Sequence, residues 1–186
     1  MRIVDRGHAL GVAVLRIAVG IVFLWAGLEK FLGAGAKGWT ALGFLKFGTA
    51  GTLSWPFVSG EPAKDAVFNP THDFWVGLAG NSGVMTAIDT LVVFGECAIG
   101  IALILGLATR FASAMGTLMM LLFFLAAWDF AYGIVNQHLT YAVVTAFLGY
   151  IGAGNYFGLD ASVARNMSPA LKKWIFSGQD VAPATA

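Results

Sequence analysis

An apolar segment near the start of the chain most constrains the fold. Residues 8–32 are apolar enough to cross a bilayer, yet they contain Arg16 and, close to the far end, Lys30. A hydrocarbon core about 30 Å thick needs about 20 helical residues, each rising about 1.5 Å. A charged side chain inside such a helix is costly and faces the bundle interior, where it meets a partner. The segment therefore predicts a membrane helix that packs against other helices.

The composition indicates lipid as the solvent of most of the chain. Of the 186 residues, 58% are hydrophobic and 11% are Asp, Glu, Lys or Arg, whereas soluble domains contain about 25% charged residues. The net charge of +1 gives no basis for nucleic-acid binding. The single cysteine, Cys97, cannot form an internal disulfide. We therefore expect an all-α integral membrane protein whose surroundings are the lipid bilayer.

The hydrophobic pattern predicts a four-transmembrane-helix antiparallel bundle over residues 1–160. The predicted spans are residues 8–32, 84–105, 111–128 and 138–156. The long loop between the first two spans, residues 33–83, contains aromatic pieces at 39–47 and 74–79 that we expect to form short interfacial helices. Residues 161–186 are predicted to form an amphipathic cytoplasmic tail. The distribution of Lys and Arg favours cytoplasmic termini in a multi-pass protein of the inner membrane.

One face of the first span combines charge with glycine. On a helical wheel, all members of this face lie within about 40° of Arg16. They are Arg16, Gly20, Phe23, Gly27 and Lys30. Glycines on a membrane helix let a second helix approach closely. This face therefore predicts the contact with the partner that the charges require.

The second span supplies the complementary charge. Asp89 and Glu96 are seven residues apart and so lie about 20° from each other around the helix. If the first two spans are antiparallel and their ends lie at the same membrane boundaries, Arg16 pairs with Glu96 and Lys30 pairs with Asp89. These pairs either form a functional site or only determine which helices associate. The sequence leaves both alternatives open.

Several other kinds of site are not indicated by the sequence. The histidines, at positions 8, 72 and 138, lack the close spacing of metal ligands. No phosphate-binding glycine loop, dinucleotide fingerprint or CxxC pair is present. We expect neither a metal nor a nucleotide. A permeation path is not supported either, because the predicted spans show no broken helices or internal repeats.

Three motifs in order resemble the DoxX/DoxD membrane proteins. The first span carries Arg-x3-Gly-x2-Phe-x3-Gly-x2-Lys, beginning at Arg16. The second span and its turn carry Gly-Glu-x3-Gly-x2-Leu-x2-Gly-Leu-x-Thr-Arg, beginning at Gly95. The last is the Asn-Tyr-Phe-Gly-Leu-Asp sequence that ends at Asp160. The resemblance covers residues 11–160. The long loop, with Gly-Trp at position 38 and Phe-Leu-Lys-Phe at position 44, makes the DoxD branch look more similar.

The resemblance implies a membrane subunit of thiosulfate:quinone oxidoreductase, which passes electrons from thiosulfate to membrane quinone. It implies quinone as the ligand, with cations that hold the head group and a carboxylate that delivers protons. The candidate catalytic residues are Glu96, Arg16 and Lys30. The candidate quinone-binding residues are Arg16, Gly20, Phe23, Gly27, Lys30, Asp89, Glu96 and Arg110. A partner subunit would carry the redox centre. The alternative is a non-catalytic accessory or scaffold subunit of a larger membrane complex.

Overall fold

A computed structural model describes residues 3–33, 38–45, 69–127, 135–168 and 175. All regular structure in these residues is helical, as the sequence predicts. The elements are α1 (Ile3–Gly33), α2 (His72–Ala79), α3 (Ser82–Leu105), α4 (Thr109–Ala126), α5 (Gln137–Tyr150), the 3-10 helix η4 (Ala153–Asn155), α6 (Asp160–Val163) and the 3-10 helix η5 (Ala164–Asn166).

Three of the helices in the described ranges are long and apolar enough to cross a membrane. They are α1, through Arg6–Gly33, together with α3 and α4. Their outer faces expose large apolar side chains, which soluble proteins bury. Examples are Trp25 at 69% exposure and Leu91 at 70%. The chain is therefore a multi-pass membrane protein whose outer surface contacts the bilayer.

The fourth predicted span is shorter than the pattern at 138–156 indicates. Helix α5 has 14 residues and is about 21 Å long, which is less than a hydrocarbon core requires. It ends at Tyr150 because Gly152 adopts a left-handed backbone with φ of 65°, after which η4 begins. The predicted end of the third span at residue 128 lies outside the described residues.

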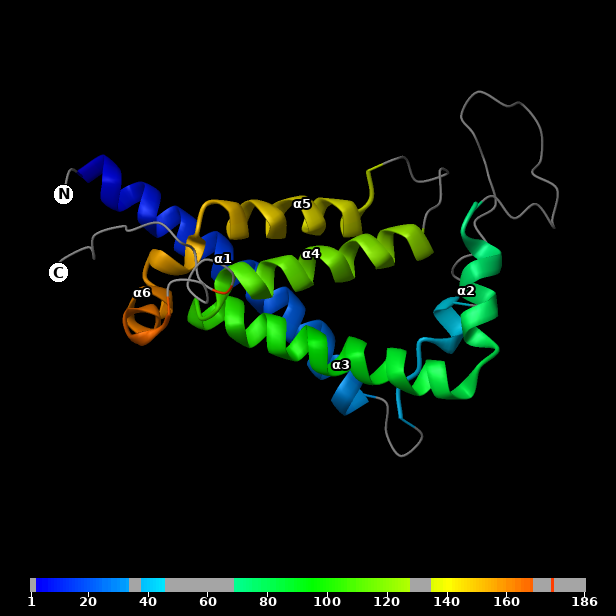
Figure 1. The fold of residues 1–186 in the computed structure, drawn as a ribbon. Coiled ribbons are helices and arrows are strands. Elements are labelled where there is room, and N and C mark those ends of the chain that lie inside the picture. The colour runs from blue at the N-terminus through cyan, green and yellow to red at the C-terminus, as the bar shows by residue number, and fades with distance from the viewer. Residues whose placement is uncertain (1–2, 34–37, 46–68, 128–134, 169–174, 176–186) are drawn as a thin grey trace, which may run out of the picture.

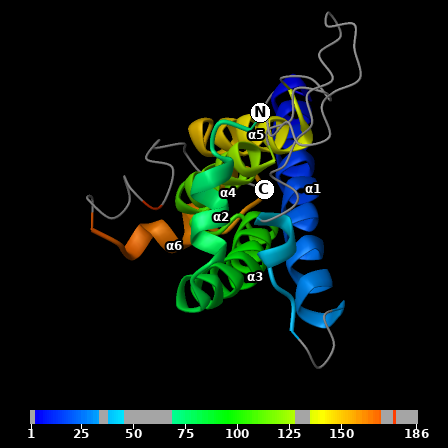
Figure 2. The same cartoon turned by 90° about the vertical axis from the view of Figure 1, so that its right-hand side faces the viewer.

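The long helices form two packed pairs (Figure 1). Helix α1 crosses behind α3, and α4 runs beside α5, while α2 lies crosswise at the end where α3 begins. Figure 2 views the bundle from the end at which α2 lies, with α1 running along one side. The start of α1 and helix α6 both lie at the opposite end (Figure 1).

Glycines set the register of α1 against α3. A Cβ on Gly100 would lie 2.5 Å from the backbone nitrogen of Leu24, and one on Gly20 would lie 2.8 Å from Ile104 Cγ1. Only the hydrogen side chain of glycine fits at these positions, so the backbones of α1 and α3 are in contact there. The face that the wheel predicts on the first span is the buried face of α1, since Arg16 and Phe23 are 0% and 3% exposed.

The buried apolar side chains form two clusters along the bundle. One cluster joins all four long helices and includes Phe23, Leu103 and Leu148. The other, which includes Trp75 and Met85, joins α2 to α3, α4 and the residues before α2. The predicted interfacial piece at 74–79 is α2. The piece at 39–47 forms a short helical turn at 41–45, and its last two residues lie outside the described ranges. So does most of the predicted tail.

Candidate functional site

An ion pair joins the last turn of α1 to the second half of α3. Lys30 Nζ lies 2.7 Å from Glu96 Oε2 and 2.9 Å from Oε1, and it also donates to the carbonyl of Ala26 at 3.2 Å. The Lys30 side chain is 22% exposed and that of Glu96 is 3% exposed. Trp39 covers the lysine, with Nζ 5.5 Å from the ring centroid. A cation so placed over an aromatic face is attracted to it.

A glycine makes this pair possible. A Cβ on Gly27 would lie 2.6 Å from Cys97 Sγ and 3.1 Å from Glu96 Cβ. Any larger residue would push α1 away from α3 and separate the charges. The structure thus brings together three of the predicted site residues, namely Gly27, Lys30 and Glu96.

The predicted pairings of Arg16 with Glu96 and of Lys30 with Asp89 are wrong. Arg16 bonds other groups, Glu96 pairs with Lys30, and Asp89 Oδ1 instead accepts from the backbone N–H of Ala41 at 2.8 Å. The reason is the register of the two helices. The prediction aligned the helix ends, whereas the glycine contacts place Glu96 beside Gly27, far along α1 from Arg16.

Arg16 binds backbone carbonyls at the opposite end of the bundle. Its Nη1 donates to Ala153 O at 2.7 Å and Tyr156 O at 3.0 Å, and its Nη2 donates to Phe157 O at 3.2 Å. The side chain is fully buried. Two glycines leave room for the guanidinium, since a Cβ on Gly106 or Gly158 would lie within 2.6 Å of Nη1. Arg16 therefore fastens α1 to the segment that follows α5.

Asp160 completes this end of the bundle by capping α4. Its carboxylate oxygens accept from the backbone N–H of Thr109 at 3.3 and 3.2 Å, while Ala108 at the N-cap makes no side-chain cap bond. The Asp160 N–H donates to Gly106 O at 2.9 Å. Burial raises the pKa of the Asp160 carboxyl, and the bonds to Thr109 and the charge of Arg16 only partly oppose this rise. A carboxylate at a helix N-terminus is stabilising.

The predicted site residues therefore divide into two groups. Arg16 and Lys30 are 14 residues apart on α1, which is about 21 Å along the helix axis. Arg110 is exposed in the first turn of α4, near the Arg16 end. Gly20 and Phe23 lie between the groups, in the α1–α3 contact and the core. One ligand head group cannot contact both ends.

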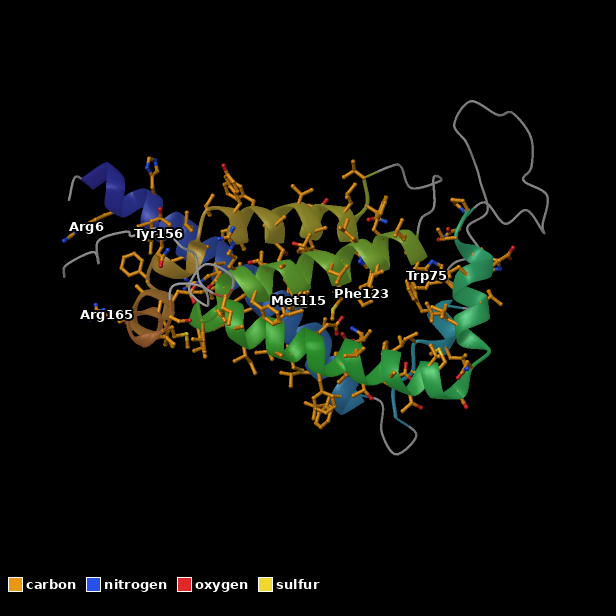
Figure 3. The ribbon with its side chains drawn as sticks, viewed as in Figure 1. Arg6, Trp75, Met115, Phe123, Tyr156 and Arg165 are labelled. Atoms are coloured by element: carbon orange, nitrogen blue, oxygen red, sulfur yellow. The ribbon has the colours of Figure 1, made fainter. Side chains whose placement is uncertain are left out.

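An apolar cavity of about 630 Å³ separates α3 from α4. In Figure 3, Met115 and Phe123 of α4 lie in the space between the two helices, and Trp75 faces it from α2. Water finds no polar partners there. Hydrocarbon must therefore fill it.

The cavity lies next to the ion pair. Phe123, which lines it, packs edge-on against His138 with ring centroids 5.7 Å apart, and Phe44 packs on Phe123 at 6.4 Å. The charge of Lys30 acts on His138 electrostatically. On α3, Gly95 lines the cavity directly before Glu96. Phe123 thus contacts both His138 and the apolar space.

Sequence reasoning missed the aromatic part of this region. Trp39 was expected only to lie in the interface, and His138 only to begin the fourth predicted span as a polar residue. The signal that would have found Trp39 is its closeness in sequence to Lys30. Asn69 was also missed: it is 4% exposed and its Nδ2 donates to the carbonyls of Leu125 and Ala126 at 3.0 and 2.9 Å. Among the described residues, no three His, Cys, Asp or Glu side chains gather closely enough to hold a metal ion.

The fold and the site define a class of protein, the multi-pass helical membrane protein with a charged pair buried between its first two long helices. A family model described as "TQO small subunit DoxD" matches residues 69–181. The chain belongs to this DoxD family, so the predicted resemblance is confirmed. The matched residues include Glu96, Arg110 and Asp160 but not α1. No curated protein and no solved structure shows a significant match to the chain.

Proposed function

We propose that this chain is the small membrane subunit of a thiosulfate:quinone oxidoreductase and that it binds the quinone head group beside Lys30 and Glu96. The family assignment supports a subunit of such a complex. The observation that carries the site is the Lys30–Glu96 pair, held within membrane helices under the Trp39 ring. A buried ion pair in a membrane protein is by default a functional hypothesis.

The residues around the pair suit a quinone. The exposed part of Lys30 offers a cation to a carbonyl oxygen, where it stabilises negative charge that develops on reduction. The Trp39 ring beside it offers a flat apolar surface to a planar head group. Glu96, whose two oxygens both bond to Lys30, is placed to exchange a proton with that lysine or with the bound ligand. The quinone itself supplies the electron-accepting chemistry.

With this function we propose a four-helix bundle in the inner membrane, in which the short helix α5 provides the fourth crossing. The start of α1 and helix α6 lie at the same end of the bundle, as an even number of crossings requires. We propose that this end is cytoplasmic, because it carries Arg6, Arg110 and Arg165. The Lys30 site then lies toward the outer face, where a partner subunit that oxidises thiosulfate would dock.

The decisive experiment measures quinone reduction by the intact complex that contains Glu96→Gln. General acid–base groups contribute about 10²- to 10⁴-fold to rates, so we expect a loss of at least about a hundredfold. Thiosulfate oxidation with a water-soluble acceptor should stay unchanged. The matched control is Glu29→Gln, which neutralises an exposed carboxylate on α1. Equal activity in both variants would refute the role of Glu96.

A second candidate is a non-catalytic accessory subunit. The observation that favours it is that both Nη atoms of Arg16 bind backbone carbonyls and that Lys30 and Glu96 already bond to each other. On this alternative the charges only hold the helices together. The complex with Glu96→Gln would then lose stability, and its activity per assembled complex would remain that of the wild type.

A further inference from the structure

We propose that the cavity between α3 and α4 holds the isoprenoid tail of the quinone. This inference rests on the proposed function and adds to it a second subsite, which Gly95, the residue before Glu96, helps to line. The volume of about 630 Å³ lies within the range of about 300–1,000 Å³ that is usual for small-molecule sites. The cavity thus has the capacity of a ligand site.

Small side chains on both walls keep the cavity open. On α3 the walls are formed at Gly95, Ala98 and Ala102, and on α4 by Ala108 and Ala112. Larger apolar residues surround these small ones, so a chain-like ligand would run along the seam between the helices. The rim includes Leu91, Phe111 and Leu118, whose exposure of 50–70% shows that the cavity opens toward lipid. A hydrophobic ligand can therefore enter from the membrane.

The position of the cavity favours a quinone tail over a phospholipid chain. Its end near α2 meets Phe44 and Phe123, and Phe123 packs on His138, on which the charge of Lys30 acts. A ligand that places its head group at Lys30 can therefore lay its tail in the cavity. The lining offers carbon and sulfur almost alone, so it suits a hydrocarbon tail and not a polar head group.

The test compares two ubiquinones that differ only in tail length, one with a single isoprene unit and one with a long tail. Each is titrated into the protein in phosphatidylcholine nanodiscs, with its concentration expressed per lipid. Ala98→Phe and Ala102→Phe fill the cavity from α3. Ala114→Phe is the matched control, because Ala114 is exposed on α4 and does not line the cavity. Thermal unfolding of each variant confirms that it is folded.

We expect each cavity-filling variant to weaken binding of the long-tailed ubiquinone by at least about tenfold, since that loss corresponds to about two methylene groups no longer buried. Binding of the short-tailed analogue should change less than twofold, and the control should bind both like the wild type. If the cavity-filling variants and the control bind the long-tailed ubiquinone with equal affinity, the tail site is overturned. The head-group site would still stand in that case if Glu96→Gln weakens the binding of both ubiquinones. A wild type that binds neither analogue overturns both proposals. A third outcome is that the wild type retains phospholipid, that Ala98→Phe loses it and that the long-tailed ubiquinone does not displace it. This outcome would assign the cavity to an acyl chain and overturn the tail site.

Discussion

Replacing Arg16 with methionine tests whether this buried cation is a structural fastener. Methionine keeps much of the length and apolar volume of the side chain but removes every donor. The carbonyls of Ala153, Tyr156 and Phe157 then lose the guanidinium that binds them. Because these carbonyls lie in a closely packed turn, no other donor replaces it. The variant should therefore unfold more easily.

The magnitude follows from the hydrogen bonds. A bond from a charged donor contributes about 1.5–3 kcal/mol. The contacts of 2.7 and 3.0 Å are good bonds, whereas the one of 3.2 Å is at the limit of the usual range. The two good bonds alone give a loss of about 3–6 kcal/mol in the free energy of unfolding. Arg16→Lys should lose about half of this, because one ammonium cannot reproduce the planar fork of the guanidinium.

The assay is reversible unfolding in mixed detergent micelles, followed by far-ultraviolet circular dichroism. Arg6→Met is the matched control, because Arg6 is an exposed arginine on the same helix, and it should leave the unfolding midpoint unchanged. Quinone reduction per folded complex should be the same in wild type and Arg16→Met. If Arg16→Met is as stable as the wild type but has lost quinone reduction, this reasoning is refuted and Arg16 belongs to the ligand site.

Three further predictions concern the helix contacts and caps. Gly20→Ala should lower the free energy of unfolding by about 1–3 kcal/mol, as overpacking does. Gly11→Ala should slightly raise it, because a Cβ on Gly11 meets nothing within 4 Å. Chemical denaturation of both variants checks this. The raised pKa of Asp160 means that the folded protein holds this proton more tightly than the unfolded chain, so its contribution to stability is complete below the ordinary aspartate pKa and is lost as pH rises through the raised value. Asp160→Asn keeps an oxygen that can cap α4 but cannot titrate, so the loss of stability with rising pH should be smaller in this variant. An unchanged dependence of stability on pH would contradict the assignment of this loss to Asp160. Asn69→Ala should cost about 1–3 kcal/mol, because Ala126 O loses its side-chain donor and Leu125 O keeps only that of Thr71. A hydrogen-exchange measurement should show the last turn of α4 opening first.

The sequence predicted the buried face of α1 because a helical wheel depends only on the helix period. Arg16, Phe23 and Gly27 are buried on that face, and Glu29 is exposed on the other. Helix α3 begins and ends within two residues of its predicted bounds, since Asn81 caps its start and Gly106 ends it. Periodicity and caps are local features, and local features can be read from a sequence.

The axial register of α1 against α3 was not predictable in this way. A wheel gives direction around the helix and no offset along it, so Glu96 was assigned to Arg16 and not to Lys30. The partners of Arg16 are backbone carbonyls, which any residue type presents and no side-chain pattern reveals. The cavity was also hidden, because it arises from the way α3 and α4 diverge and not from any motif.

The bonds of Arg16 have a consequence for how the chain is made. The Arg16 guanidinium on α1 cannot form its hydrogen bonds until the chain includes carbonyls that lie about 140 residues later in the sequence. At about 5–20 residues per second, translation takes roughly 7–28 s to reach them. A lone arginine in the bilayer core costs about 2.5–3.5 kcal/mol or more during that time. The insertion machinery must therefore shield α1 until the last helix arrives, and the bundle closes only when synthesis has passed Asp160.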